Sequence, residues 1–228
     1  MMVKQFTLLA LLTGIVSFAQ QKPVFGINAG ATFSNVRTSN LNEDIGDDAY
    51  YEGPKYGANF LVGISFEYFI NDSFSILANA NYERKSYSRK LHLITYDFND
   101  FDPVISGTPT TTKFKTTLNY LTIPINLKYY LGNEKKFYVN GGPFLGFFLD
   151  SKSKTNGKES ANENDYYKTL DFGVNLGVGT NFKLSDKYNL NLEIRHNYGL
   201  TNISKHQFVN SYYMKTNSFN LIANWQFN

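Results

Sequence analysis

Apolar and polar residues alternate along much of this chain, and the pattern is clearest between residues 170 and 182. Every second residue from Leu170 to Phe182 is apolar or threonine, while the residues between them are Asp171, glycines and asparagines. A period of two predicts a β-strand with one apolar and one polar face. The stretch is longer than the roughly 5–6 residues of an average strand in a soluble protein. Its length therefore suggests more than an ordinary soluble strand.

The same alternation recurs and predicts eight strands. They are expected near residues 24–34, 57–69, 74–85, 118–131, 136–149, 169–182, 187–198 and 217–227. Short turns at 70–73, 132–135 and 183–186 alternate with long connections at 35–56, 86–117, 150–168 and 199–216. This layout is typical of outer-membrane barrels. We therefore predict an all-β, eight-stranded antiparallel up-and-down transmembrane β-barrel with short periplasmic turns and four long extracellular loops.

Aromatic residues decide which face meets lipid. With successive strands running up and down, the apolar faces carry aromatics at two heights, roughly 20–25 Å apart, close to the apolar band of about 25 Å expected between aromatic girdles. A soluble lipocalin-like barrel would turn this face inward and gives no reason for two rows of rings. The row at the long-loop end comprises Phe33, Phe60, Tyr82, Phe147, Phe172, Tyr198 and Phe219, and the row at the short-turn end comprises Phe25, Phe66, Tyr68, Phe74, Tyr129, Phe137, Phe182, Tyr188, Trp225 and Phe227.

The polar faces must then line the barrel interior, and they carry charges of both signs. Eight strands enclose a space only wide enough for side chains, and an unpaired buried charge is costly. We therefore expect a plugged barrel with a salt-bridged network, whereas an ion path along the same groups is the alternative. The network consists of Glu67, Glu83, Lys85, Lys128, Asp171, Glu193 and Arg195.

The start of the chain has the pattern of a secretory signal peptide. Lys4 is followed by an apolar run and by the small-x-small sequence Ser17-Phe18-Ala19. We expect residues 1–19 to be cleaved and residues 20–228 to form a single barrel domain. The formal net charge of +3 is too weak to indicate a nucleic-acid partner, and the absence of cysteine excludes disulfides and thiolate metal sites.

Two nucleotide-site motifs are present in form only. Asp171-Phe172-Gly173 matches the metal-binding triplet of protein kinases, and Gly177-Val178-Gly179 resembles the start of a phosphate loop. The third glycine and the following helix of such a loop are missing, and the order of the two motifs is reversed relative to kinases. The glycines are better explained by a crowded barrel interior.

Three histidines raise the possibility of an outer-membrane hydrolase. His92 and His206 are expected in the second and fourth long connections, where they could meet acidic residues above the rim. His196 falls on an apolar face near Tyr198, where an interfacial position is expected. The histidines lack metal-ligand spacing, and we expect neither a metal nor a cofactor. A narrow ion-conducting pore is the further alternative.

The long connections also contain candidate recognition features. The run 42–48 is acidic but lacks the ordered pattern of a calcium loop. The tyrosine pairs 50–51, 166–167 and 212–213 are residues that supply rigid, amphipathic contact area. Strands that continue past the membrane would explain these tyrosines equally well.

Four stretches together resemble the PorT-like outer-membrane β-barrel family of Bacteroidetes-type bacteria, over nearly the whole mature chain. They are YLTIPINLKYY (120–130), YVNGGPFLGFF (138–148), DFGVNLGVG (171–179) and LEIRHNYGLTN (192–202). The resemblance implies an outer-membrane barrel, and the founding member of that family is tied to a protein secretion and gliding machinery. The expected function is a non-enzymatic scaffold or accessory component. The expected partners are outer-membrane lipid, the barrel-assembly machinery and possible secretion-system proteins.

Overall fold

The structure is a computed structural model that describes residues 23–39, 49–93, 110–132, 134–160, 163–205 and 213–227. Nine strands and one short 3-10 helix occur within these residues. They are β1 (Val24–Thr38), β2 (Ala49–Phe69), β3 (Phe74–Leu93), β4 (Thr110–Leu131), β5 (Phe137–Thr155), β6 (Lys158–Glu159), the 3-10 helix Asn164–Tyr166, β7 (Leu170–Lys183), β8 (Tyr188–Gly199) and β9 (Met214–Phe227). The predicted signal peptide lies outside the described residues.

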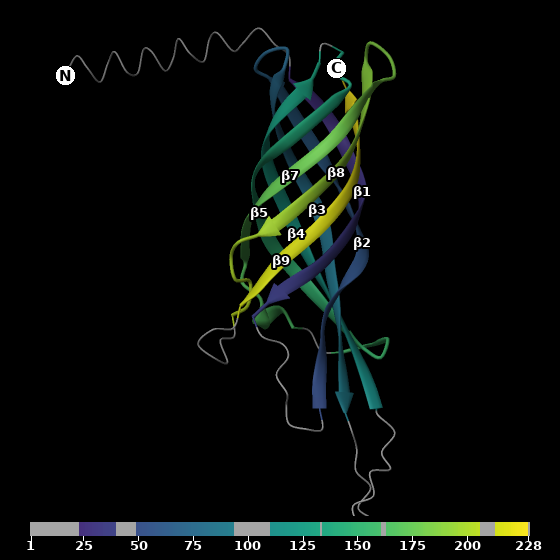
Figure 1. Cartoon of the computed structure of the whole chain (residues 1–228), viewed down its shortest axis with the longest axis vertical. Coiled ribbons are helices and arrows are strands. Elements are labelled where there is room, and N and C mark those ends of the chain that lie inside the picture. Colours follow the sequence, from purple (N-terminus) through teal and green to yellow (C-terminus); the bar gives the residue numbers. More distant parts are fainter. Residues whose placement is uncertain are drawn as a thin grey trace, which may run out of the picture.

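Eight of the strands close into a ring, which confirms the predicted antiparallel up-and-down arrangement. Each strand pairs with the next along the chain, except that β5 pairs with β7, and β1 pairs with β9 to complete the circle. The two-residue strand β6 only adds to the outer part of β5. The strands tilt strongly around the barrel axis, as Figure 1 shows. Among the described residues, no helix is long and apolar enough to cross a bilayer.

The seam between first and last strands has an unbroken register. Phe25 pairs with Phe227 at one end and Thr38 with Met214 at the other. Gly30 lies within this seam, and a Cβ atom at that position would lie 2.2 Å from the backbone oxygen of Leu221. Glycine is therefore required there by the close approach of β9, because any side chain would collide with the neighbouring backbone.

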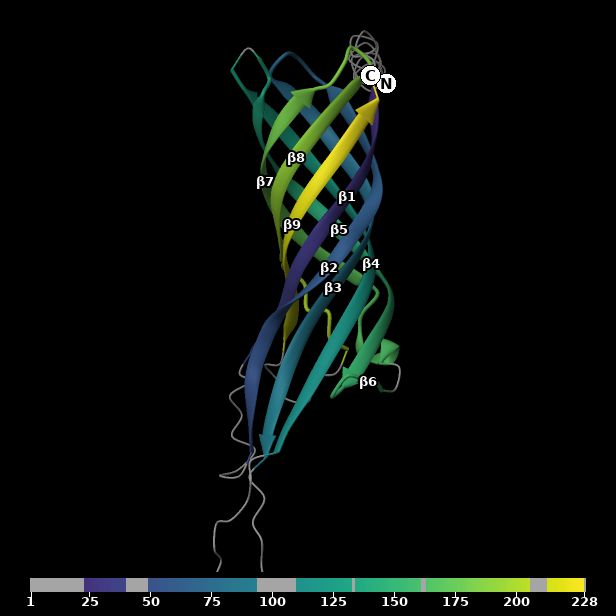
Figure 2. The same cartoon turned by 90° about the vertical axis from the view of Figure 1, so that its right-hand side faces the viewer.

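The predicted strand ends were wrong at the end with the long connections. β2, β3, β4 and β5 all continue into segments that the sequence assigned to loops; β3, for example, runs to Leu93 and β4 begins at Thr110. β2–β4 project beyond the ring as a three-stranded sheet (Figure 2). Both faces of this extension lack the apolar alternation that identifies a half-buried strand, so periodicity could not detect it. The three long connections involved are correspondingly shorter than expected.

Candidate functional site

The outer wall of the ring is apolar and carries the predicted aromatic residues. Neighbouring strands bring these rings together in both rows. The ring centroids of Phe60 and Tyr82 are 6.2 Å apart in one row, and those of Phe74 and Tyr129 are 4.9 Å apart in the other. Tyr82 and Tyr68 are half-buried, and the other predicted row members are exposed on the outside. An exposed apolar wall of this extent is incompatible with water and requires a lipid environment.

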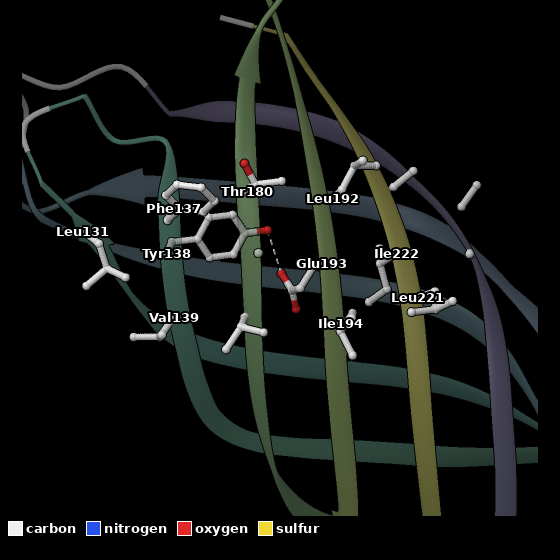
Figure 3. A pocket seen from close by; sticks show the side chains of 15 residues that line it. Leu131, Phe137, Tyr138, Val139, Thr180, Leu192, Glu193, Ile194, Leu221 and Ile222 are labelled. Atoms are coloured by element: carbon white, nitrogen blue, oxygen red, sulfur yellow. Dashed lines mark hydrogen bonds between the residues drawn. The ribbon is translucent and has the colours of Figure 1, made fainter.

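A shallow apolar groove of about 770 Å³ crosses this wall over β1, β4, β5, β7, β8 and β9 (Figure 3). Larger side chains such as Val139 and Ile194 flank the groove. The paired residues Ala29 and Ala223 form its floor, because their side chains are small. The groove has the chemistry of a surface that packs against lipid chains. The hydroxyl of Thr180, which also lines the groove, donates to the backbone oxygen of Lys136 at 3.0 Å.

The interior contains three layers of charged residues, the first of which lies near the short turns. Glu67 is fully buried and receives an ion pair from Lys128, with Nζ 3.2 Å from a carboxylate oxygen. Neutral donors complete its shell: the hydroxyl of Tyr130 at 2.7 Å, the side-chain amide of Gln226 at 2.6 Å and the hydroxyl of Ser75 at 2.5 Å. Donors from β3, β4 and β9 thus converge on one β2 carboxylate.

The second layer is centred on Glu193 of β8. Its carboxylate accepts from the guanidinium of Arg195 two residues further along the strand, and Arg195 also donates to Asn79 at 3.1 Å. Tyr138 reaches across β7 to donate to Glu193 at 3.1 Å, as Figure 3 shows. This reach depends on Gly179, because a Cβ atom there would lie 2.3 Å from the Tyr138 ring.

The third layer contains two carboxylates and one cation. Lys85 lies 3.2 Å from Asp171 and 4.0 Å from Glu83, and all three side chains are buried. Ser218 and Asn220 donate to Glu83, while Thr216 donates to the same Asp171 oxygen that Lys85 contacts. The seven interior groups therefore comprise four carboxylates and three cations, and every one of them contacts a group of opposite charge.

An apolar cluster closes the end of the interior above this layer. The described residues 163–169, before β7, and 200–205, after β8, fold over the opening, and Tyr167 forms an isolated bridge with Ser204. The phenol oxygens of Tyr87 and Tyr167 lie 3.0 Å apart, and burial raises the pKa of both tyrosines. We call this cluster the cap. Its members are Val36, Tyr87, Leu118, Tyr120, Tyr167, Ile203 and Met214, with Phe148 packed against it.

The candidate hydrolase residues do not form the expected rim site. His92 lies within β3, not in a loop, and His206 lies outside the described residues. The Nδ1 atom of His92 is 3.0 Å from the Thr111 hydroxyl, its Nε2 atom is 3.8 Å from Glu52, and its ring stacks on Tyr50. Within the described part of the chain, no three potential ligands cluster in a way that could hold a metal ion.

His196 is bound to neighbouring residues of the outer wall. Its Nε2 atom lies 2.6 Å from the side-chain oxygen of Asn217, and its ring stacks on Phe219 with centroids 4.3 Å apart. The imidazole of His196 therefore packs beside the aromatic row, where its hydrogen bond and its ring stacking both link it to β9.

The tyrosine pairs are divided between two environments. Tyr50 and Tyr166 are exposed, as is Tyr213, whereas Tyr167 is buried in the cap. Sequence reasoning missed the cap because its members are scattered through polar segments. The one available signal was the apolar character of Tyr87, Leu118 and Tyr120 at the ends of the predicted strands.

A closed ring of eight antiparallel strands, apolar outside and polar inside, defines an integral β-barrel of the outer-membrane class. Residues 18–205 match the sequence profile described as outer membrane protein beta-barrel domain, and the chain belongs to this family. The protein is therefore located in the outer membrane. A comparison with curated protein sequences gives no significant match.

Several solved outer-membrane structures are similar. Neisserial surface protein A has 15% identity and a TM-score of 0.42, covering 91% of this chain and 99% of that one. OprG from Pseudomonas aeruginosa has 11% identity and a TM-score of 0.44, covering 91% and 96%. The outer-membrane protease OmpT from Escherichia coli has 11% identity and a TM-score of 0.41, covering 92% and 97%.

Proposed function

We propose that the protein is a non-enzymatic scaffold or accessory component of the outer membrane, which binds partner proteins through the projecting sheet of β2–β4. The observation that carries this proposal is the filled interior: paired charges occupy it and the cap closes one end. A barrel without a passage acts through its surfaces. Among the described strands, β2–β4 extend beyond the ring and offer such a surface as the projecting sheet.

The proposal includes an orientation. The short turns face the periplasm and the projecting sheet faces the cell exterior, as in other barrels of this class. The tight turns at 70–73 and 184–187, which hold backbone hydrogen bonds such as Ile70 to Phe74 and Leu184 to Tyr188, support the first part. The exposed Tyr50 on β2 supports the second, since tyrosine supplies contact area at recognition surfaces.

The resemblance to the PorT-like family favours a protein secretion and gliding machinery as the assembly that contains this barrel. Outer-membrane lipid and the barrel-assembly machinery are the other expected partners. In this reading the barrel anchors the machinery in the membrane and contributes no chemistry of its own.

Site-specific photo-crosslinking in the native outer membrane tests the proposal. A photoreactive phenylalanine analogue replaces Tyr50 on the projecting sheet or, as the matched control, Tyr188 beside a short turn. Both side chains point outward from the barrel, Tyr50 on the projecting sheet and Tyr188 in the aromatic row at the opposite end, so the control reports neighbours at that end of the barrel. Crosslinks to secretion or motility proteins from position 50, followed by recovery of the same proteins in a mild-detergent pull-down, support it. Recovery of the barrel alone contradicts it.

One observation favours the hydrolase alternative, namely the sequence of contacts Thr111–His92–Glu52. It has the order of a hydroxyl, a base and an orienting carboxylate. However, Glu52 is shared with Lys55 and Lys90, and hydrogen bonding from Lys55 holds its pKa below the usual value. The matched variants Thr111→Ala and His92→Ala test this role: hydrolysis of peptide or lipid ester substrates that both variants abolish would establish the enzyme in place of the scaffold.

A further inference from the structure

A small polar pocket of about 270 Å³ lies just beyond the aromatic row on the side of the projecting sheet. Strands β3, β4 and β5 supply basic residues to it, and β6 supplies one acid. Its basic residues are Arg84, Lys115, Lys152 and Lys154, its acid is Glu159, and Asn59 and Thr117 complete the wall.

The position of the pocket relative to the lipid band follows from the strand register. Arg84 lies two residues beyond Tyr82, and its guanidinium carbon is 5.5 Å from the ring centre of Phe60. Lys115 lies six residues beyond Leu121, which pairs with both Tyr82 and Phe147 of the row. At the usual rise and tilt, the pocket therefore spans roughly 5 to 15 Å beyond the row. Lipid headgroups begin within this interval.

The charges in the pocket are not balanced by the protein. Lys115 and Lys154 are direct cross-strand neighbours, an arrangement in which like charges destabilise a sheet. Glu159 lies opposite Lys154, but no ion pair forms between them among the described residues. Four cations against one carboxylate leave an excess of three positive charges.

Three basic residues elsewhere on the described surface differ from these, because each has an acidic partner. Lys90 pairs with Glu52, Lys135 with Asp72 and Lys183 with Asp186. Arg84 instead has a buried Nε atom that lacks a hydrogen-bond partner within the described chain. A clustered excess of cations with an unused donor is the arrangement that binds an anion.

We propose that this pocket binds the phosphate of a lipid headgroup in the outer leaflet, a phosphorylated sugar lipid. The inference rests on the orientation given under the proposed function, since only that orientation brings the pocket to the outer leaflet. Arg84 contacts the phosphate nearest the acyl chains, and the lysines bind oxygens further from the membrane. Because one water molecule takes about 30 Å³ of liquid, the pocket has room for a phosphate and part of its sugar.

The test uses the purified full-length mature barrel in lipid nanodiscs containing lipid A, and native mass spectrometry counts the lipid that stays bound. The pocket variant is Lys115→Gln/Lys154→Gln, and the charge-matched control is Lys183→Gln/Lys187→Gln at the opposite end. All four lysines are exposed, so both variants should fold, and heat-dependent migration in electrophoresis verifies this. We expect the pocket variant to retain bis-phosphorylated lipid A about 30-fold more weakly than wild type. The control should retain it normally.

Three results would overturn the proposal: equal retention by both variants, equal retention of dephosphorylated lipid A, or occupation of the pocket by inorganic phosphate alone at the same concentration. Loss of a cellular protein crosslink in the pocket variant, with lipid retention unchanged, would assign the pocket to a protein and also overturn it. The crosslinking from position 50 is independent of purified lipid. A failure of the scaffold function is therefore distinguishable from a failure of this site.

Discussion

The ammonium nitrogen of Lys128 lies 3.2 Å from a carboxylate oxygen of Glu67, and neither side chain is exposed. The pair joins β4 to β2 through the interior, although β3 separates the two strands in the wall. It therefore braces the barrel across its width in a way that backbone pairing cannot.

Replacing Lys128 by methionine should destabilise the barrel by about 3–5 kcal/mol, because the Glu67 charge would remain buried without its counter-ion. The double variant Glu67→Gln/Lys128→Met should recover part of this loss. Urea unfolding in lipid vesicles measures both. Lys135→Met removes a surface pair with Asp72 and should cost no more than about 1 kcal/mol. If the double variant loses as much stability as Glu67→Gln and Lys128→Met lose together when measured singly, the two side chains do not act as a pair.

Substitution of Gly30 by alanine should weaken the seam between β1 and β9 by about 1–3 kcal/mol, because the new methyl group would collide with the backbone of Leu221. Gly53 on the projecting sheet has open space around its Cα, so Gly53→Ala should stay within about 0.5 kcal/mol of wild type. Urea midpoints of the two variants provide the comparison. Equal midpoints would show that the seam tolerates a side chain.

The cap should lose stability at high pH. Burial raises the pKa of Tyr87 above its ordinary value of about 10, so the folded state holds this proton more tightly than the unfolded state. The contribution of Tyr87 is therefore complete below about pH 10 and is lost as the pH rises through the raised pKa. The free energy of unfolding of wild type, relative to that of Tyr87→Phe, should therefore fall between about pH 8 and about pH 11. A constant difference would contradict the burial of the phenol.

Planar bilayer recordings of the wild-type barrel should show no stepwise ion conductance, because the interior is filled by paired charges and covered by the cap. Disruption of the second layer by Arg195→Ala should destabilise the barrel, since Glu193 loses its ion pair. Regular conductance steps in wild type that change with Glu193→Ala, with stability unaltered, would instead establish the pore alternative.

The ring of eight strands and the identity of its faces could be predicted because one side of each strand meets lipid and the other meets polar side chains. The same alternation predicts that the seven charged residues face the interior. Which charges pair could not be predicted, because Lys85 and Asp171 meet across the interior from β3 and β7. That contact depends on how the strands are staggered around the ring, and one strand's pattern carries no information on stagger.

The projecting sheet and the cap escaped prediction for a different reason. Residues 86–93 and 110–117 are mostly polar or charged, so their strand structure comes from pairing with neighbours and not from an apolar face. Tyr167 and Ile203 lie within mostly polar connections, which have no apolar periodicity. Only the three-dimensional closure of the barrel brings them together.

The pairing of Phe25 with Phe227 joins the two ends of the described chain, about 200 positions apart in sequence, and this has a consequence for biogenesis. Contacts between such distant positions form late, because the whole intervening chain must be ordered first. Until β9 has been delivered, β1 and β8 both keep an open edge that can pair with another chain. The barrel therefore keeps an open, aggregation-prone edge until its last strand has inserted, and a chain that ends before Met214 should aggregate or be degraded in the periplasm.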